Sequence, residues 1–136
     1  MKILLAATAF IEVGAGLALI GFPSAAVALL LGSPLDTPAA VTLGRLTGAA
    51  LFTPGIACWL ARGDAQSRAA RGLAAAMLFY NFAAVALFVL AGIGFGLRGV
   101  ALWPAVALHA AMAIWCITCL RCRLSASGRA LNETQQ

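Results

Sequence analysis

The feature that most constrains this chain is a series of four long apolar stretches, each close to the ~20 residues that an α-helix needs to cross a bilayer. The 136 residues are 63% hydrophobic and only 10% charged, so too few charged side chains are present to cover the apolar ones in water. These proportions exclude a soluble enzyme, a nucleic-acid-binding protein and a disordered chain. They predict membrane spans at about residues 3–22, 39–61, 72–97 and 101–120.

The expected fold is a single all-α membrane domain, a four-transmembrane-helix bundle over residues 1–123 with a polar cytoplasmic tail over 124–136. Strands of a membrane β-barrel would be about ten residues long with strict alternation of polar and apolar side chains, and no such pattern occurs. Between the first two spans, the apolar segment 24–32 is too short to cross. It follows Pro23 and ends at Gly32, which are typical first and last residues of a helix. We therefore predict a short interfacial helix between helices 1 and 2.

Basic residues are unequally shared between the two sides of the predicted membrane. An even number of crossings puts both termini on one side, and seven basic residues fall on that side against one on the other. Cytoplasmic loops carry an excess of Lys and Arg, so both termini are predicted to face the cytoplasm, with the chain in a bacterial inner membrane. The net charge of +5 then reflects topology and contact with anionic lipid headgroups. The seven residues are Lys2, Arg62, Arg68, Arg71, Arg121, Arg123 and Arg129, and the eighth is Arg98.

Small residues recur at four-residue spacing in the second predicted span, at Ala40, Gly44 and Gly48. Such a strip lets helix backbones approach closely within a membrane. We interpret it as packing inside the bundle. A seam between two copies is the alternative, so the predicted partners are the lipid bilayer and either a second copy or a larger membrane complex.

Strongly polar residues fall at a similar depth in all four predicted spans. At a rise of 1.5 Å per residue, Glu12, Arg45, Asn81 and His109 lie within roughly one helical turn of one another in depth. An isolated charge near mid-membrane costs at least ~2.5–3.5 kcal/mol, so we predict that Glu12 pairs with Arg45. Asn81 and His109 would complete the network beside Tyr80. These five residues are the candidate binding site.

Two interpretations of this cluster are open. In the first interpretation, the cluster forms a polar cavity that binds a headgroup, a quinone or a small solute. In the second, it is a buried network that only fixes the register of the helices. One histidine does not suffice for bis-histidine haem, and one histidine with one glutamate provides few ligands for a metal ion. No cofactor, metal ligand or catalytic residue is therefore predicted, since no nucleophile is accompanied by a base.

Four cysteines, at 58, 116, 119 and 122, include a Cys-x-x-Cys-x-x-Cys run in the last span. This spacing occurs in zinc and iron–sulfur sites. On one continuous helix, however, the three sulfurs point over a wide arc that a single ion cannot easily bridge. We interpret the thiols as small apolar core residues, with a redox or metal site as the alternative.

The segment Phe10-Ile11-Glu12-Val13-Gly14 resembles the first-helix motif of the small multidrug resistance transporters, which are also four-helix proteins. In that family the membrane glutamate exchanges protons for cationic drugs, and the resemblance would give this role to Glu12. The likeness is confined to this segment, and Arg45 is a departure from the family pattern.

A broader pattern resembles small uncharacterised bacterial four-helix membrane proteins, loosely those of the DoxX type. This resemblance implies a bacterial inner-membrane protein with the bundle fold and assigns no activity to any residue. The pattern consists of Glu12 with Gly14, Gly44-Arg45 through Trp59, Tyr80-Asn81, and Trp103-Pro104 to His109.

Three classes of function follow. The first is a non-catalytic membrane protein, either an accessory subunit or a binder of a lipid-like or quinone-like amphiphile through the polar cluster. The second is a proton-coupled transporter of a small solute that uses Glu12. The third is a membrane-embedded enzyme or quinone-linked subunit that uses Tyr80, His109 and Arg45.

Overall fold

The structure is a computed structural model that describes the backbone of residues 1–133 and the side chains of residues 1–121. Within that part of the chain every regular element is helical and no strand is present. The elements are α1 (Lys2–Gly21), α2 (Pro23–Leu31), α3 (Pro38–Ala61), the 3-10 turn η1 (Arg62–Asp64), α4 (Arg68–Val89), the π-helical turn η2 (Leu90–Gly94) and α5 (Leu102–Glu133).

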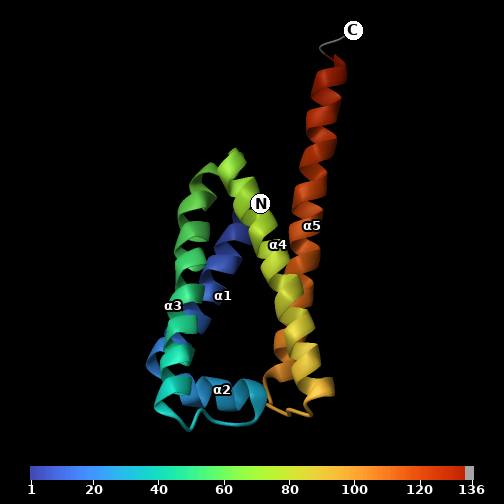
Figure 1. Ribbon diagram of the computed structural model, residues 1–136. Coiled ribbons are helices and arrows are strands. Elements are labelled where there is room, and N and C mark those ends of the chain that lie inside the picture. The colour runs from blue at the N-terminus through green and yellow to red at the C-terminus, as the bar shows by residue number, and fades with distance from the viewer. Residues whose placement is uncertain (134–136) are drawn as a thin grey trace.

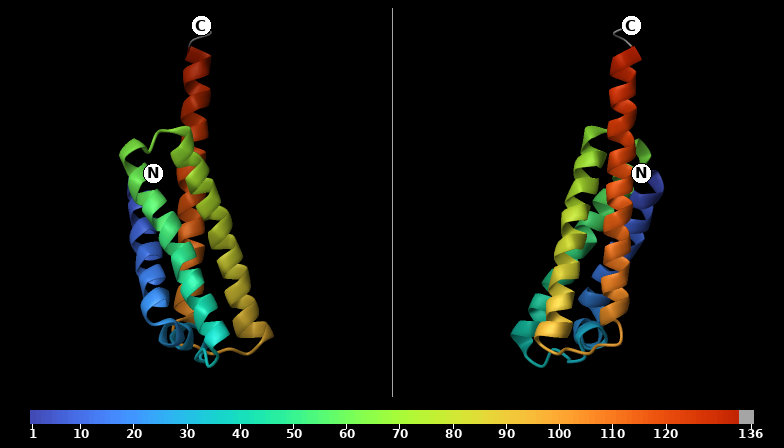
Figure 2. Two further views of the ribbon diagram at one scale, coloured as in Figure 1. Left: turned by 60° about the vertical axis from the view of Figure 1, so that its left-hand side comes forward. Right: turned by 90° about the vertical axis from the view of Figure 1, so that its right-hand side faces the viewer.

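The four long helices follow one common axis, and α2 lies across one end of them (Figures 1 and 2). The start of α1 and the end of α5 both lie at the opposite end (Figure 1). α5 extends well beyond the other helices there, because its backbone stays helical to Glu133 (Figure 2). Ten residues of the predicted tail, 124–133, thus continue this helix, and the last three lie outside the described residues.

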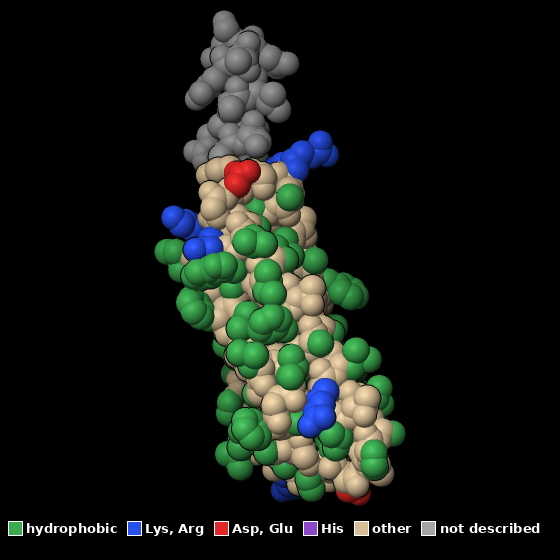
Figure 3. Space-filling model, turned by 90° about the vertical axis from the view of Figure 1, so that its left-hand side faces the viewer, with side chains coloured by type: hydrophobic (Ala, Val, Ile, Leu, Met, Phe, Trp, Pro, Cys, Tyr) green, Lys and Arg blue, Asp and Glu red, His purple; other side chains and the backbone are tan. Residues whose placement is uncertain are grey.

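Three helical segments are long and apolar enough to cross a membrane, namely Lys2–Gly21, Arg68–Gly94 and Leu102–Arg121. They indicate a membrane protein, and they overlap three of the four predicted spans. α3 is also long, at 24 residues. Its arginine, threonines, glycines and prolines lower its mean hydropathy, and it is not among the three. Hydrophobic side chains cover much of the face shown in Figure 3, and basic side chains lie near its upper end and also in its lower half.

Local sequence explains where several helices begin and end. Thr37 and Ser67 precede α3 and α4, and each side-chain oxygen accepts a hydrogen bond from the backbone N–H three residues later, at 3.2 and 3.1 Å. Pro23 starts α2, and Gly32 closes it in the left-handed conformation, with φ 83°. The short helix predicted between the first two long ones is confirmed. Its position at a membrane interface remains a prediction.

The end of α4 differs from the predicted span of 72–97. The helix begins earlier, at Arg68, and its α-helical part stops at Val89. The π-helical turn that follows contains Gly92 and Gly94, and the chain then leaves the helix. Glycine has a low helix propensity because it loses more conformational freedom than other residues when it enters a helix. The α-helix therefore ends at the glycine-rich segment, although the apolar stretch continues beyond it.

The helices pack as two pairs, α1 against α3 and α4 against α5, whereas α3 and α4 meet over only a short length. α1 and α3 cross at two glycines: a Cβ atom on Gly48 would lie 2.7 Å from the Gly16 carbonyl oxygen. Gly44 and Gly48 are both buried against other segments of the chain, so these two residues pack within the bundle as predicted. A buried core near the end that holds the N-terminus is formed by Leu4, Leu5, Ala9, Cys58, Ala70, Met77, Met112 and Cys116.

Candidate functional site

Asn81 of α4 and His109 of α5 form a buried hydrogen bond, with 2.8 Å between Oδ1 and Nδ1. The Asn81 amide nitrogen donates to the Met77 carbonyl oxygen at 2.7 Å. Its Oδ1 is therefore the acceptor, and the proton of the shared bond belongs to Nδ1 of His109. This pair joins the middle of α4 to α5 and fixes the plane of the imidazole ring.

Two aromatic rings of α4 hold the imidazole from other directions. The Tyr80 ring meets His109 edge to face, with centroids 5.6 Å apart and planes at 79°. Phe88, two turns further along α4, lies at the same centroid distance with planes at 46°. The Tyr80 side chain thus packs on His109 through its ring and leaves its hydroxyl for another partner.

Glu12 of α1 is buried, with 3% of its surface exposed. Gly55 of α3 makes room for it, since a Cβ atom at Gly55 would lie 3.2 Å from Cβ of Glu12. Ala9, one turn before Glu12 on α1, belongs to the same buried core as Cys58, and Tyr80 packs against that core. Glu12, Tyr80, Asn81 and His109 are therefore brought to one region of the bundle interior.

Arg45 is not part of this region, and the predicted ion pair with Glu12 is wrong for the described side chains. Arg45 is exposed on α3, whereas Glu12 is buried. The reason is helical geometry: Gly44 packs against Pro23 and Leu35, Gly48 packs against α1, and the residue after Gly44 is rotated by about 100° from that glycine. The depth of Arg45 in the membrane was predicted by counting residues along the helix. The rotation of α3 about its own axis, which decides where the side chain points, was not predicted.

A groove lies between α3 and α4, where these two helices diverge toward α2. It contains two cavities, of about 350 Å³ and about 320 Å³, and Leu51 and Tyr80 line both. Their other lining side chains are almost all apolar, so Tyr80 is the polar residue that the two cavities share. The larger cavity is lined by Leu19, Val27, Leu30, Gly44, Thr47, Leu51, Tyr80, Ala83, Ala84, Leu87 and Phe88. The smaller is lined by Ala50, Leu51, Pro54, Leu73, Ala76, Met77 and Tyr80.

The cysteines occupy the core beside this region. Cys58 of α3 and Cys116 of α5 are fully buried, and Cys119 is half-buried; all three are free thiols. Among residues 1–121, no group of three or more His, Cys, Asp or Glu side chains is placed to hold a metal ion. Cys122 lies outside the residues whose side chains are described.

The α3–α4 groove was missed by sequence reasoning. A signal for it exists in α4, where alanine occupies positions 76, 83 and 84 on the side that faces α3. These small side chains of α4 lie opposite α3, which contains Pro54, and the space between the two helices is not filled by a large residue.

No protein-family model, curated protein or solved structure matches this chain.

Proposed function

We propose that the protein is an integral membrane protein with four crossings that binds a lipid-like or quinone-like amphiphile in the α3–α4 groove. The observation that carries the proposal is the position of Tyr80, which is shared by both cavities of an otherwise apolar groove. Small-molecule sites typically combine an apolar lining with a few converging polar groups. The tail would lie along the apolar lining, and the polar head would reach the Tyr80 hydroxyl.

The groups behind Tyr80 support this assignment. Its ring packs on His109, and His109 is in turn held by Asn81. Glu12 is buried one turn from Ala9, which belongs to the core on which Tyr80 packs. A hydroxyl that is fixed by such neighbours can donate to a carbonyl or ester oxygen of a ligand without losing further conformational freedom.

The fourth crossing in this proposal is α3. Its 24 residues span about 36 Å, which exceeds the ~30 Å hydrocarbon core. α3 also packs closely along α1, a membrane-length helix. With four crossings, the basic loop and tail residues favour a cytoplasmic side for both termini, in a bacterial inner membrane. The resemblance to DoxX-type proteins remains a prediction.

Photolabelling of the full chain in lipid nanodiscs tests the binding proposal. The probes are a fatty acid and a short-chain quinone, each with a diazirine on its tail. We expect labelled peptides from α3 and α4, and at least one probe should be competed by its unlabelled parent. Labelling spread evenly over exposed side chains of all helices would contradict the proposal.

A matched pair of variants localises the signal. Ala83→Phe fills the larger cavity, whereas Ala86→Phe adds the same ring to an exposed position of α4. Labelling should be lost only in the first variant. Tyr80→Phe keeps the ring on His109 and removes the hydroxyl, so it should weaken quinone labelling by a factor of several, corresponding to one net hydrogen bond of about 1 kcal/mol.

A proton-coupled transporter is the second candidate, because Arg45 does not neutralise Glu12. A permanently paired carboxylate would suit a purely structural role, and no such pair forms within the described residues. Glu12→Gln is expected to abolish solute uptake by proteoliposomes under a pH gradient while the folded protein is retained. Uptake that is unaffected by this substitution would exclude the transporter.

A further inference from the structure

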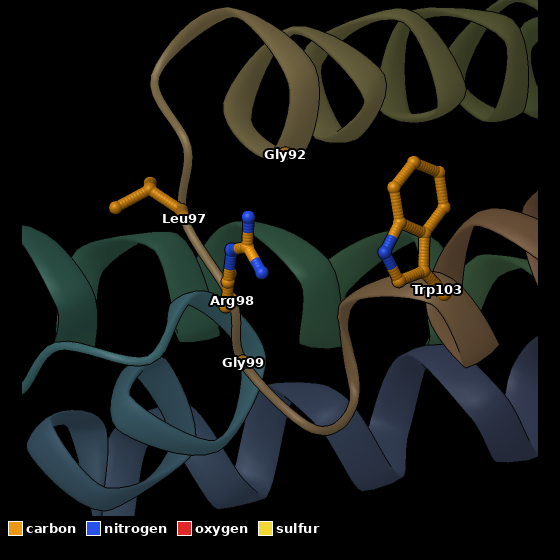
Figure 4. Close-up of a pocket in the computed structure, with 5 residues that line it drawn as sticks. All are labelled: Gly92, Leu97, Arg98, Gly99 and Trp103. Atoms are coloured by element: carbon orange, nitrogen blue, oxygen red, sulfur yellow. The ribbon is translucent and has the colours of Figure 1, made fainter.

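A third cavity lies at the α2 end of the molecule, apart from the two cavities of the α3–α4 groove. It has a volume of about 310 Å³ and is lined by Gly92 of η2, by Leu97, Arg98 and Gly99 of the connecting loop, and by Trp103 of α5. Figure 4 shows the Arg98 guanidinium and the Trp103 ring on opposite sides of the space beneath Gly92. The indole nitrogen lies on the ring edge toward Arg98, and Leu97 points away (Figure 4).

The loop that carries Arg98 is held rigidly against α2. The Ala101 N–H donates to the Leu29 carbonyl oxygen at 3.0 Å, and Gly99 lies in close backbone contact with Leu30. Gly32, in its left-handed conformation, packs against the backbone of Arg98. The position of the Arg98 backbone is therefore set before any ligand binds, which lowers the entropic cost of binding.

Two groups that only donate hydrogen bonds face this cavity. Within the part of the chain whose side chains are described, the Arg98 guanidinium forms no ion pair or hydrogen bond, and neither does the Trp103 indole N–H. No carboxylate lines the cavity. Guanidinium groups recognise phosphate through two parallel hydrogen bonds, and the indole N–H supplies a third donor. A site with donors and no acceptor side chain selects an anion.

The surroundings of the cavity are apolar and exposed. Ile93 and Phe95 beside Gly92, and Val100 beside Gly99, each expose more than 70% of their surface. Tryptophan is also enriched at the level of lipid headgroups. A ligand with both a phosphate group and acyl chains therefore fits this end of the molecule.

We propose that the cavity between Gly92, Arg98 and Trp103 binds the phosphate group of an anionic ester, with Arg98 as its main ligand and Trp103 as a second donor. A phospholipid headgroup and a water-soluble phosphate ester share this chemistry. The site is separate from the α3–α4 groove, so its test is independent of the proposed function.

Quenching of Trp103 fluorescence gives a signal that is local to the cavity. The full chain carries Trp59→Phe and Trp115→Phe, so that Trp103 is the remaining tryptophan. The probes are brominated phosphatidylglycerol and brominated phosphatidylcholine with the same acyl chains, added to protein in neutral detergent micelles. We expect half-maximal quenching at a lower concentration of the anionic lipid, by about fivefold, the effect of one basic residue near an anionic membrane surface.

Arg98→Gln should make the two lipids equal, and Arg98→Lys should restore part of the difference through charge alone. The matched control Arg68→Gln removes the same charge from the first residue of α4, at the opposite end of that helix, and should leave the difference intact. An unchanged preference in Arg98→Gln, or an equal loss in the control, would overturn the proposal. Inorganic phosphate separates the two sources: if it displaces the anionic lipid, the ligand is a soluble phosphate, and if it does not, the ligand is the lipid.

Discussion

The close crossing of α1 and α3 can be tested by replacing Gly48 with alanine. The added Cβ atom would lie 2.7 Å from the Gly16 carbonyl oxygen and 2.8 Å from the Ile20 nitrogen. Both are backbone atoms, so no side-chain rotation relieves the contact. The helices must separate by about 0.7 Å before the closest distance reaches 3.4 Å, where ordinary van der Waals contact begins.

A separation of this size has a calculable effect on stability. A radial gap of about 0.5–1 Å already loses a quarter to a half of the dispersion attraction between facing atoms. Overpacking of a close-packed interior costs typically 1–3 kcal/mol, and we expect Gly48→Ala to lower the free energy of unfolding by about this amount. The matched control is Gly14→Ala in α1, where nothing lies within 4 Å of the added atom. Helix propensity alone favours alanine there, by roughly 0.5–1 kcal/mol.

The assay is reversible unfolding of the full chain in mixed micelles, with increasing sodium dodecyl sulfate and circular dichroism as the signal. Gly16→Ala disrupts the same contact from the other helix, so the two destabilisations should not add in the double variant. If Gly48→Ala and Gly14→Ala unfold at the same detergent fraction, the backbone contact between the two glycines does not hold α1 to α3.

Two further predictions use the same preparation. Replacing Asn81 with alanine leaves the buried His109 Nδ1–H without its acceptor and should lower the free energy of unfolding by about 1–3 kcal/mol. A double-mutant cycle with His109→Ala should give a coupling energy of about 0.5–3 kcal/mol. Strictly additive losses would show that this hydrogen bond does not contribute to stability. Alanine at Gly99 places a Cβ atom against the Leu30 carbonyl group, so it should release the loop from α2 and speed proteolysis there. Gly63→Ala, where nothing surrounds the added atom, should leave the cleavage rate unchanged.

Much of the helical framework could be predicted because its signals are local. Apolar stretches of membrane length gave three of the candidate spans, and Pro23 with Gly32 marked the short helix between the first two long ones. The end of α4 was less predictable, because hydropathy continues past Gly92 while helical geometry does not. The predicted pair of Glu12 with Arg45 placed α1 beside α3, but the faces by which these helices meet were not predicted, since they depend on how each helix is rotated about its axis.

The candidate site divides in the same way. Equal depth correctly suggested that Asn81 and His109 could meet, because both also happen to lie on inward faces. Equal depth failed for Arg45, which lies on an outward face. The groove between α3 and α4 depends on the divergence of two helices and on what small residues leave unfilled, so no short motif encodes it.

The three faces of α3 explain how these features fit one helix. Gly48 and Gly55 turn toward α1, and their lack of side chains makes room for the Gly16 backbone and for Glu12. Leu51 turns toward α4 and lines the groove. Arg45 belongs to the remaining, exposed face, seven residues or about 10 Å from the start of the helix. In the proposed arrangement of four crossings, its long side chain can extend its charge toward the nearer headgroups. The low hydropathy of α3 thus comes from residues that pack, line a cavity or reach an interface, and each of these roles is compatible with a membrane-spanning helix.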